Sequence, residues 1–327
     1  MQIYHDSDVD INVLKGKKIS VLGYGAQGRA QALCFRDSGL DVTVGLRKDG
    51  KSWNKAKEDG LKVAEIADAV KGADVVMMLL PDEVQPDIYK EFVQPNLKKG
   101  AALEFAHGFA ITYKLISPPK DVDVIMMAPK SPGDMEREVF LQGFGVPALV
   151  CVHQDSTGNA KKIALALAKG LGSTRAGVFE TTFDNETKTD LFGEQAVLCG
   201  GLTALIKAGF KTLVDGGYPP EMAYFEVLHE VKLIDDLINK GGFELMWHVV
   251  SNTAEYGGLT RRDKVITPES LKGMKSILED IESGKFKNDW RAEWAAGLVN
   301  LKRMEDEEKK LQLEVVGREI RRLFERK

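Results

Sequence analysis

Four acidic residues stand in two pairs within apolar stretches of the second half of the sequence. Asp190 and Glu194 lie in DLFGEQAVLC, and Glu226 and Glu230 lie in AYFEVLHEV. Residues four apart share one face of an α-helix, and two carboxylates in apolar surroundings are costly to desolvate unless a cation compensates them. Oxygen ligands without a cysteine or histidine shell favour Mg²⁺ or Mn²⁺, and two such pairs could hold two ions. Because the chain contains 49 acidic residues, two solvated pairs remain the alternative.

A glycine-rich turn follows the first apolar run of the sequence, KISVLG. It has the pattern G-x-G-x-x-G and consists of Gly23, Tyr24, Gly25, Ala26, Gln27 and Gly28. In dinucleotide-binding folds the first glycine allows a tight turn, the second lets the backbone approach the pyrophosphate, and the third packs the helix on the strand. The motif alone is weakly specific, but its place between a strand and a helix predicts a dinucleotide site.

The end of the second predicted strand favours NADPH over NADH. Four residues there could contact a 2′-phosphate by charge or hydrogen bonding: Arg47, Lys48, Lys51 and Ser52. An NAD site would instead place an acid there, about 20 residues after the turn, to accept from the ribose hydroxyl. Asp49 could do this and is the discordant residue. We therefore expect NADPH as the cofactor, with NADH as the weaker alternative. The other alternative is that the basic residues form a solvated loop without a role in binding.

Two further candidates come soon after predicted strands. His107 follows AALEFA, and Lys130 follows VDVIMMA by one residue. Open parallel sheets bind their ligands at the carboxyl ends of the strands, so we expect both side chains near the cofactor. A structural histidine is the alternative interpretation of His107.

The elements that would position these residues change character along the chain. Apolar runs at 18–23, 41–46, 74–80, 101–106, 122–128, 147–152 and 174–179 predict strands, and helical segments at 26–38, 53–59 and 159–169 alternate with them. Near-continuous apolar strands separated by helices predict an α/β Rossmann-type fold, a doubly wound parallel sheet.

After about Thr182 the strand signal ends, and helices are predicted at 188–208, 210–217, 220–239, 268–283 and 302–327. We therefore expect a dinucleotide-binding domain at 1–182 and an all-α domain at 183–327. The charge-laced last helix is expected to be a solvated surface helix.

Composition narrows the class of protein. Hydrophobic residues make up 43% and charged residues 29% of the 327, as in ordinary globular proteins. The net charge of −4 with mixed signs argues against nucleic acid as a partner. We see no apolar run near the ~20 residues that span a bilayer, so no membrane is expected. The three cysteines are far apart and form no disulfide framework, which fits a cytoplasmic protein.

The motifs together resemble the ketol-acid reductoisomerase family, in its short form with one helical domain. The resemblance covers essentially the whole chain through GYGAQGRAQA (23–32), LLPDEVQP (79–86), FAHGF (105–109), APKSPG (128–133), TDLFGEQAVLCGG (189–201), AYFEVLHEVKLI (223–234) and SNTAEYGG (251–258). It implies conversion of 2-acetolactate or 2-aceto-2-hydroxybutyrate, by alkyl migration and NADPH reduction, to the 2,3-dihydroxy acid that leads to valine, leucine and isoleucine.

The resemblance also implies roles for individual residues. Asp190 would bridge two Mg²⁺ ions, with Glu194 on one and with Glu226 and Glu230 on the other. His107 and Lys130 would order water and substrate oxygens, and Glu230 would transfer the proton. Further cofactor contacts would come from Leu80, Pro81, Asp82, Gln85, His107 and Gly133, and substrate contacts from Pro132, Cys199 and Ser251. Two chains of a homodimer would share each active site, with Glu226, Glu230 and Ser251 from the partner chain. The dimer could belong to a larger oligomer.

Several positions depart from the family pattern. Ala110 replaces an asparagine, Ser131 and Asp134 replace a glycine and a histidine, Arg29 replaces a frequent histidine, and Trp247 lies where a tyrosine is frequent. None removes a predicted ligand, but Asp134 and Trp247 put the range of substrates in question. Two alternatives remain: a metal-free β-hydroxyacid dehydrogenase, which gives the acidic pairs no role, and a dinucleotide-binding module without catalysis.

Overall fold

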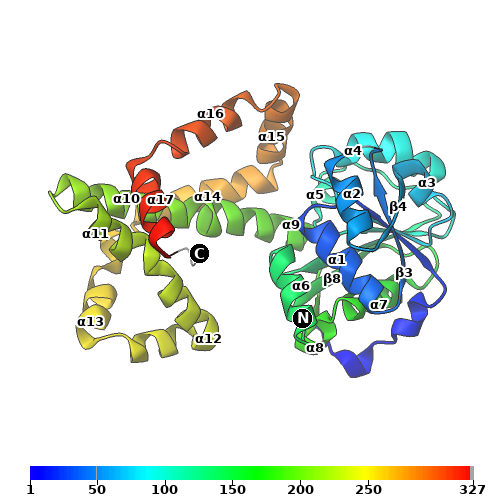
Figure 1. Cartoon of the computed structure of the whole chain (residues 1–327), viewed down its shortest axis with the longest axis horizontal. Coiled ribbons are helices and arrows are strands. Elements are labelled where there is room, and N and C mark those ends of the chain that lie inside the picture. The colour runs from blue at the N-terminus through cyan, green and yellow to red at the C-terminus, as the bar shows by residue number, and fades with distance from the viewer. Residues whose placement is uncertain (49, 325–327) are drawn as a thin grey trace. The chain divides into compact units, whose positions relative to one another are not determined.

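A computed structural model describes residues 1–48 and 50–324 of the chain (Figure 1). The chain forms two compact units, Met1–Thr189 and Asp190–Lys327. The division falls inside helix α9 (Phe183–Phe192), which begins where we predicted the second domain to begin. The boundary after residue 182 stays a prediction, because a helix that runs through the division belongs in part to both units.

The first unit is built on one sheet. Among the described residues nine strands form it, in the order β1-β9-β8-β7-β6-β5-β2-β3-β4. Their bounds are β1 Ile3–Tyr4, β2 Lys18–Leu22, β3 Asp41–Leu46, β4 Lys62–Glu65, β5 Val75–Met78, β6 Ala102–Phe105, β7 Asp123–Pro129, β8 Ala148–Gln154 and β9 Val178–Glu180. The strands from β4 to β7 in this order pair in parallel, whereas β8 is antiparallel to β7 and β1 is antiparallel to β9.

Helices cover both faces of the sheet (Figure 1). Their bounds are α1 Ala26–Asp37, α2 Lys51–Glu58, α3 Ile66–Val70, α4 Gln85–Ile88, α5 Phe109–Thr112, α6 Gly133–Leu141, α7 Ala160–Gly170 and α8 Ser173–Ala176. On one face, residues of α1 and α7 share a buried cluster with strand residues, as Phe35 does with Val21 and Ile125. On the other face, α3 and α5 share a cluster that includes Phe105. The predicted Rossmann-type fold is confirmed.

One strand prediction was wrong in detail, and two strands were not predicted. The segment 174–179 is helix α8 followed by a strand that begins only at Val178. We missed β1 and β4, and neither contains a buried residue. They are the two edge strands of the sheet, β1 at one end of the order and β4 at the other. An edge strand that is half solvated lacks the continuous apolar run that reveals a central parallel strand.

The second unit is helical, as predicted. Its helices are α10 Gly200–Asp215, α11 Pro220–Tyr224, α12 Val231–Val249, α13 Asn252–Arg261, α14 Pro268–Glu282, α15 Lys285–Ala295, α16 Val299–Glu308 and α17 Gln312–Phe324. Two π-helical turns, η5 (Gly193–Leu198) and η6 (Phe225–His229), interrupt the α-helices. The predicted helix at 188–208 is therefore divided among α9, η5 and α10. Helix α10 also includes most of the separate helix predicted at 210–217 and ends at Asp215.

The last predicted helix, at 302–327, was wrong in two respects. It is broken between α16 and α17, and α17 is not merely a solvated surface helix. Leu313 and Ile320 are each 5% exposed and share a buried cluster with Phe210 and Tyr224. Residues 325–327 of this prediction lie outside the described part of the chain.

The run Phe183–Asp215 is long and apolar enough to cross a membrane by length and composition alone. Its most apolar window has a mean hydropathy of 1.5, and 6% of that window is buried. The expectation that no apolar segment reaches this length was wrong, because GEQAVLCGGLTA contains mostly small or apolar residues and a single charged one. The run leaves Leu198, Leu202 and Leu205 exposed on this chain.

Candidate functional site

The predicted residues of the first unit gather at one edge of the sheet. The parallel strands β7, β6, β5, β2 and β3 are neighbours, so their carboxyl ends lie at the same edge. Strand β7 leads into Lys130 and β6 leads into His107. Strand β5 leads into the segment with Leu80, Pro81, Asp82 and Gln85, β2 leads into the turn 23–28, and β3 leads into Arg47 and Lys48. Ligands bind at this edge in open α/β sheets.

The glycine turn is shaped for close approach. Gly23 has φ +102°, and a Cβ there would lie 2.3 Å from the Leu79 carbonyl oxygen. A Cβ at Gly28 would lie 2.5 Å from the Gly23 carbonyl oxygen. A Cβ at Gly25 would meet nothing within 4 Å, so this glycine faces open space. The first and third glycines are thus required by the protein's own backbone, and the second leaves room for a ligand.

The start of α1 adds phosphate-binding capacity to this turn. Gly25 is the N-cap residue and offers no side-chain cap, which leaves the first N–H groups of α1 to an external acceptor. Helix α6 begins against the same turn, since a Cβ at Gly133 would lie 2.3 Å from the Ala26 carbonyl oxygen. The Gln27 side-chain amide donates to the Ser131 carbonyl at 2.9 Å. The residues present therefore fit a dinucleotide.

The predicted 2′-phosphate residues lie around the start of α2. Arg47 and Lys48 are exposed after β3, and Lys51 and Ser52 are the first two residues of α2. The nearest acid recorded for Lys48 is Glu65, at 4.0 Å. Asp49, the discordant acid, lies outside the described residues.

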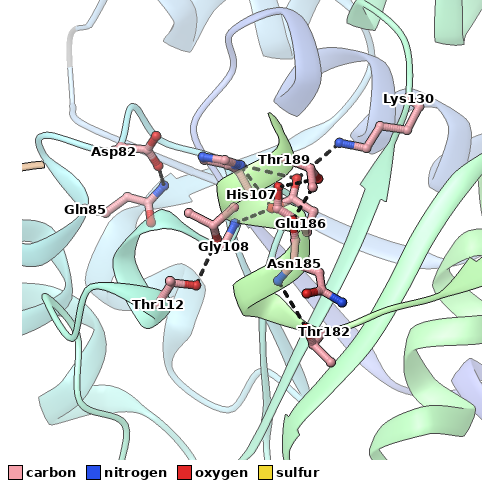
Figure 2. Close-up of polar contacts among 11 residues, drawn as sticks. Asp82, Gln85, His107, Gly108, Thr112, Lys130, Thr182, Asn185, Glu186 and Thr189 are labelled. Atoms are coloured by element: carbon pink, nitrogen blue, oxygen red, sulfur yellow. Dashed lines mark hydrogen bonds and ion pairs between the residues drawn. The ribbon is translucent and has the colours of Figure 1, made fainter. Parts of the chain in front are cut away.

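The loop after β5 is held by a buried amide. The Gln85 side-chain amide donates to the Leu80 carbonyl at 2.8 Å. It also donates to Asp82 Oδ1 at 3.2 Å (Figure 2). Gln85 is 4% exposed, so it braces the loop. Leu80, Pro81 and Asp82 then remain as the part of the loop that can contact a cofactor.

A buried carboxylate joins the two strand-end candidates. Glu186, on α9, has 1% of its side chain exposed, and its Oε2 lies 3.1 Å from His107 Nδ1. The backbone N–H of Gly108 donates to Oε2 at 3.0 Å, and Lys130 Nζ donates to Oε1 at 3.2 Å. Figure 2 shows the three groups converging on Glu186 from the ends of β6 and β7.

The environment of Glu186 keeps it ionised. Burial alone would raise the pKa of this carboxyl, yet its pKa lies below the ordinary value of 4.5. The hydrogen bond with His107, the charges of His107 and Lys130, and the Gly108 N–H all stabilise the carboxylate and outweigh burial. The carboxylate in turn orients the His107 ring through Nδ1.

Close packing of α9 brings Glu186 to this position. A Cβ at Gly108 would lie 2.3 Å from Thr187 Oγ1 and 3.0 Å from the Phe183 carbonyl oxygen. Thr112 Oγ1, in α5, lies 2.9 Å from the same Thr187 hydroxyl. The glycine in FAHGF is thus required because α9 approaches the end of β6 so closely.

The predicted metal ligands lie along the helices that follow. Asp190 comes one turn after Glu186 on α9, with carboxylate oxygens of the two within 4.8 Å. Glu194 lies in η5, Glu226 lies in η6, and Glu230 follows η6 directly. We assumed regular α-helical spacing for both pairs, and this was wrong, because a π-helical turn interrupts each. Such turns occur frequently at functional sites.

The remaining predicted site residues are exposed on this chain. Glu194, Glu226, Glu230, Cys199, Pro132 and Ser251 are all exposed. Within the described residues, none of the three glutamates belongs to a group of three or more potential metal ligands. Ser251 caps α13, accepting from the Ala254 N–H at 3.2 Å. Joint coordination by the two acidic pairs stays a prediction.

The departures from the family pattern have ordinary surroundings. Ala110 is fully buried in the apolar cluster beside β6, and Asp134 is exposed in the first turn of α6, where a negative charge is favourable. Trp247 packs over Gly258, where a Cβ would lie 2.7 Å from the indole ring. Ser131 offers its carbonyl to Gln27.

Comparison with known proteins agrees with the arrangement of the two units. Residues 13–177 match the family described as acetohydroxy acid isomeroreductase, NADPH-binding domain, and residues 183–326 match ketol-acid reductoisomerase, C-terminal domain. The chain belongs to the ketol-acid reductoisomerase family. The resemblance inferred from the sequence motifs is therefore confirmed.

Similar proteins support membership over the full length. Proteins named ketol-acid reductoisomerase (NADP(+)) from Methanococcus maripaludis and Methanocaldococcus jannaschii are 54% identical over 323 residues, covering 99% of this chain and 98% of each relative. A solved NADH-preferring ketol-acid reductoisomerase from an uncultured archaeon is 52% identical, with a TM-score of 0.96 over 100% of both chains. A pyrroline-5-carboxylate reductase from Coxiella burnetii, 13% identical with a TM-score of 0.55, shares the fold alone.

Glu186 was not among the residues predicted from the sequence. The residue lies in the segment between ETTF and TDLFGEQ, four positions before Asp190, beside the exposed acid Asp184. Its spacing from Asp190 is the same as that from Asp190 to Glu194, so a third acid on one helix face was the available signal. Nothing local distinguished it from a solvated acid, because its partners His107 and Lys130 are 79 and 56 residues away.

Proposed function

We propose that this chain is an NADPH-dependent, Mg²⁺-dependent ketol-acid reductoisomerase. It would convert 2-acetolactate or 2-aceto-2-hydroxybutyrate into the corresponding 2,3-dihydroxy acid of branched-chain amino-acid synthesis. Family membership supports the reaction class. The observation that carries the proposal on this chain is the cluster of Glu186, His107 and Lys130 at the same sheet edge as the glycine turn.

Alkyl migration requires a hydroxyl to lose its proton while the neighbouring ketone is polarised. When bound, two Mg²⁺ ions would supply this polarisation and NADPH would supply the hydride. His107 Nδ1 is engaged by Glu186, so proton exchange with substrate or water would fall to Nε2. Lys130, whose side chain is 36% exposed, would hold a substrate oxygen by its positive charge. Glu230 would accept the hydroxyl proton.

The donor set fits a hard divalent cation. Asp190, Glu194, Glu226 and Glu230 offer carboxylate oxygens without cysteine, the ligands that Mg²⁺ prefers. Asp190 and Glu194 would hold one ion, and Asp190 together with Glu226 and Glu230 would hold the other. Glu186, one turn before Asp190 on α9, adds negative charge beside this set.

The basic residues near the start of α2 support NADPH as the preferred cofactor. Arg47, Lys48 and Lys51 provide three positive charges and Ser52 provides a hydroxyl for the 2′-phosphate. The two NADP(+)-named relatives agree with this preference, whereas the NADH-preferring structural relative makes it a point to measure. Equal efficiency with NADH would contradict it.

We also propose that two chains share each active site, with Glu226, Glu230 and Ser251 from the partner. The exposed apolar face of α10, with Leu202 and Leu205, would be buried against the second copy rather than in a membrane. Protein, cofactor and substrate would all be cytoplasmic. The domain boundary would lie after residue 182, at the start of α9.

One assay tests the activity. Purified protein is incubated with 2-acetolactate, NADPH and Mg²⁺, and NADPH oxidation is followed together with formation of the dihydroxy acid. We expect turnover that stops with EDTA and returns with added Mg²⁺. Turnover that persists in EDTA would favour the metal-free dehydrogenase, and absence of turnover despite NADPH binding would favour a non-catalytic module.

Co-expression of two inactive variants tests the shared site. If sites are shared, a mixed dimer of Asp190→Ala and Glu226→Ala carries both lesions in one site and none in the other. Random pairing makes half of the dimers mixed, so about a quarter of wild-type activity should return. The matched control pairs Asp190→Ala with Glu194→Ala, which leaves a lesion in every site. No recovery in the first pair, with mixed dimers shown to be present, would contradict sharing.

A further inference from the structure

Asp59 connects the glycine turn with the helix that carries the predicted 2′-phosphate residues. The Tyr24 hydroxyl donates to Asp59 Oδ2 at 2.7 Å. The Arg29 guanidinium, on α1, binds the same carboxylate through two N–H groups, at 2.8 Å to Oδ2 and 3.0 Å to Oδ1. Arg36, further along α1, donates to the Asp59 backbone carbonyl. One residue thus receives hydrogen bonds from the turn and from two positions of the helix that follows it.

The helix that ends at Asp59 is short and packs on the core through few side chains. Of the eight residues of α2, Ala56 is buried and Trp53 is partly buried against the same core cluster, and Asp59 is the C-cap residue. The next residue, Gly60, has φ +79°, so the chain turns sharply there. At the other end, Lys51 and Ser52 begin the helix. A short helix that packs through two side chains depends also on contacts at its ends for its position.

The charges around Asp59 favour a lasting contact. The hydrogen bond from Arg29 is the largest influence on the Asp59 carboxyl and lowers its pKa, with Tyr24 adding to the effect. The side chains of Arg29 and Asp59 are 34% and 21% exposed, so the bidentate pair is partly shielded from water. Burial and the neighbouring carboxylate raise the pKa of the Tyr24 hydroxyl, which therefore stays a donor. The contact is geometrically specific as well as charged.

We infer that Asp59 is a positioning residue for the cofactor: it sets the distance between the glycine turn and the start of α2. This inference rests on the proposed binding of NADPH at these two places. A dinucleotide must contact the turn with its pyrophosphate and the start of α2 with its 2′-phosphate at the same time. Without the carboxylate of Asp59, the distance between the turn and the start of α2 would no longer be fixed. NADPH would lose more than NADH, because only NADPH carries the phosphate that α2 contacts.

Asp59→Asn tests the inference, with Asp74→Asn as the matched control. Asp74 has 23% of its side chain exposed and accepts from Lys98 Nζ at 2.6 Å and from the Lys18 N–H at 2.9 Å. It lies before β5, at the amino end of that strand, so the control removes a similar carboxylate away from the turn. Dissociation constants of NADPH and NADH are measured by fluorescence titration without substrate. For Asp59→Asn we expect the NADPH constant to rise about tenfold, the effect of one charge-assisted contact, and the NADH constant to rise less than about threefold. We expect Asp74→Asn to change neither.

Steady-state kinetics and a milder variant complete the test. For Asp59→Asn the KM for NADPH should rise while kcat stays within about twofold, because the nicotinamide end lies elsewhere. Tyr24→Phe removes one hydroxyl and should shift the two constants in the same direction by a smaller factor, even if Asp59→Asn fails to fold. Equal weakening of both cofactors, or no weakening in either variant, would overturn the inference. A wild-type protein that binds NADPH no better than NADH would instead overturn the proposed 2′-phosphate contacts on which it rests.

Discussion

Replacing Glu186 with glutamine removes one negative charge from a nearly buried position and keeps the size of the side chain. The carboxylate has 1% of its surface exposed and contacts His107 at 3.1 Å, Lys130 at 3.2 Å and the Gly108 N–H at 3.0 Å. The amide oxygen of glutamine could still accept from Gly108. Its NH₂ group would then face His107 or Lys130, which are donors themselves.

The expected magnitudes follow from these contacts. Two charge-assisted contacts are lost, each worth about 1.5–3 kcal/mol, and the glutamine amide can replace part of this through its own hydrogen bonds. We expect the free energy of unfolding at pH 7 to fall by about 2 kcal/mol. Because His107 and Lys130 lose the group that orients them, kcat should fall about 100-fold, or ~2.7 kcal/mol of barrier.

The loss of stability should depend on pH in one direction. The pKa of Glu186 in the folded protein lies below its ordinary value of 4.5. Its contribution to stability is therefore present above that ordinary value and is lost as the pH falls through the folded pKa. The wild-type protein and Glu186→Gln should converge in stability as the pH is lowered from 7 to 3.

Denaturant unfolding across this pH range and turnover at pH 7 provide the measurements. Asp184→Asn is the matched control on the same helix, since Asp184 pairs with Lys188 at 2.8 Å at the surface. The control should change stability by less than about 1 kcal/mol and leave kcat unchanged. A stability difference for Glu186→Gln that is the same at pH 3 and pH 7, or a kcat within tenfold of wild type, would refute the reasoning.

Three further predictions concern other parts of the chain. Gly25→Ala should weaken NADPH binding at least about tenfold without lowering the melting temperature, because its Cβ meets only open space in the protein. Gly28→Ala should lower both the affinity for NADPH and the melting temperature, because its Cβ would clash with the Gly23 carbonyl. Equal melting temperatures of the two variants would contradict this. Burial raises the pKa of Glu136 to about 8, so the folded protein holds a proton that the unfolded chain releases. Glu136 should therefore lower wild-type stability by up to about 1.4 kcal/mol per pH unit between pH 5 and 8 in denaturant titrations, and the slope should be smaller by this amount in Glu136→Gln, although buried Glu104, whose pKa is also raised, keeps its own contribution. Ile320→Ala should cost about 2–4 kcal/mol in the second unit while Leu323→Ala, at 79% exposure, costs less than about 0.5; equal thermal shifts would place α17 back in solvent.

Much of this protein was predictable from local patterns. Near-continuous apolar strands identified the central sheet, and the G-x-G-x-x-G turn identified the dinucleotide site, because burial on two faces and a tight turn each require particular residues in sequence. The two acidic pairs were visible as acids four residues apart in apolar stretches, although a π-helical turn interrupts each pair. These features depend on residues that are close together along the chain, so the sequence alone is enough to predict them.

Other features depended on which segments pack together. Glu186 looks like any acid of a helix N-terminal turn, and only the approach of α9 to Gly108 gives it His107 and Lys130 as partners. The same applies to Asp59, whose three hydrogen-bonding partners come from the turn and α1.

Where local and tertiary demands differ, the tertiary structure decided. The edge strands β1 and β4 form because a neighbouring strand offers hydrogen bonds, not because either contains a long apolar run. Helix α17 buries Leu313 and Ile320 beneath a charged sequence because Tyr224 and Phe210 provide an apolar surface for them. Periodicity along a chain specifies the elements, but the partner that each side chain meets is set by packing between distant segments, which no local pattern records.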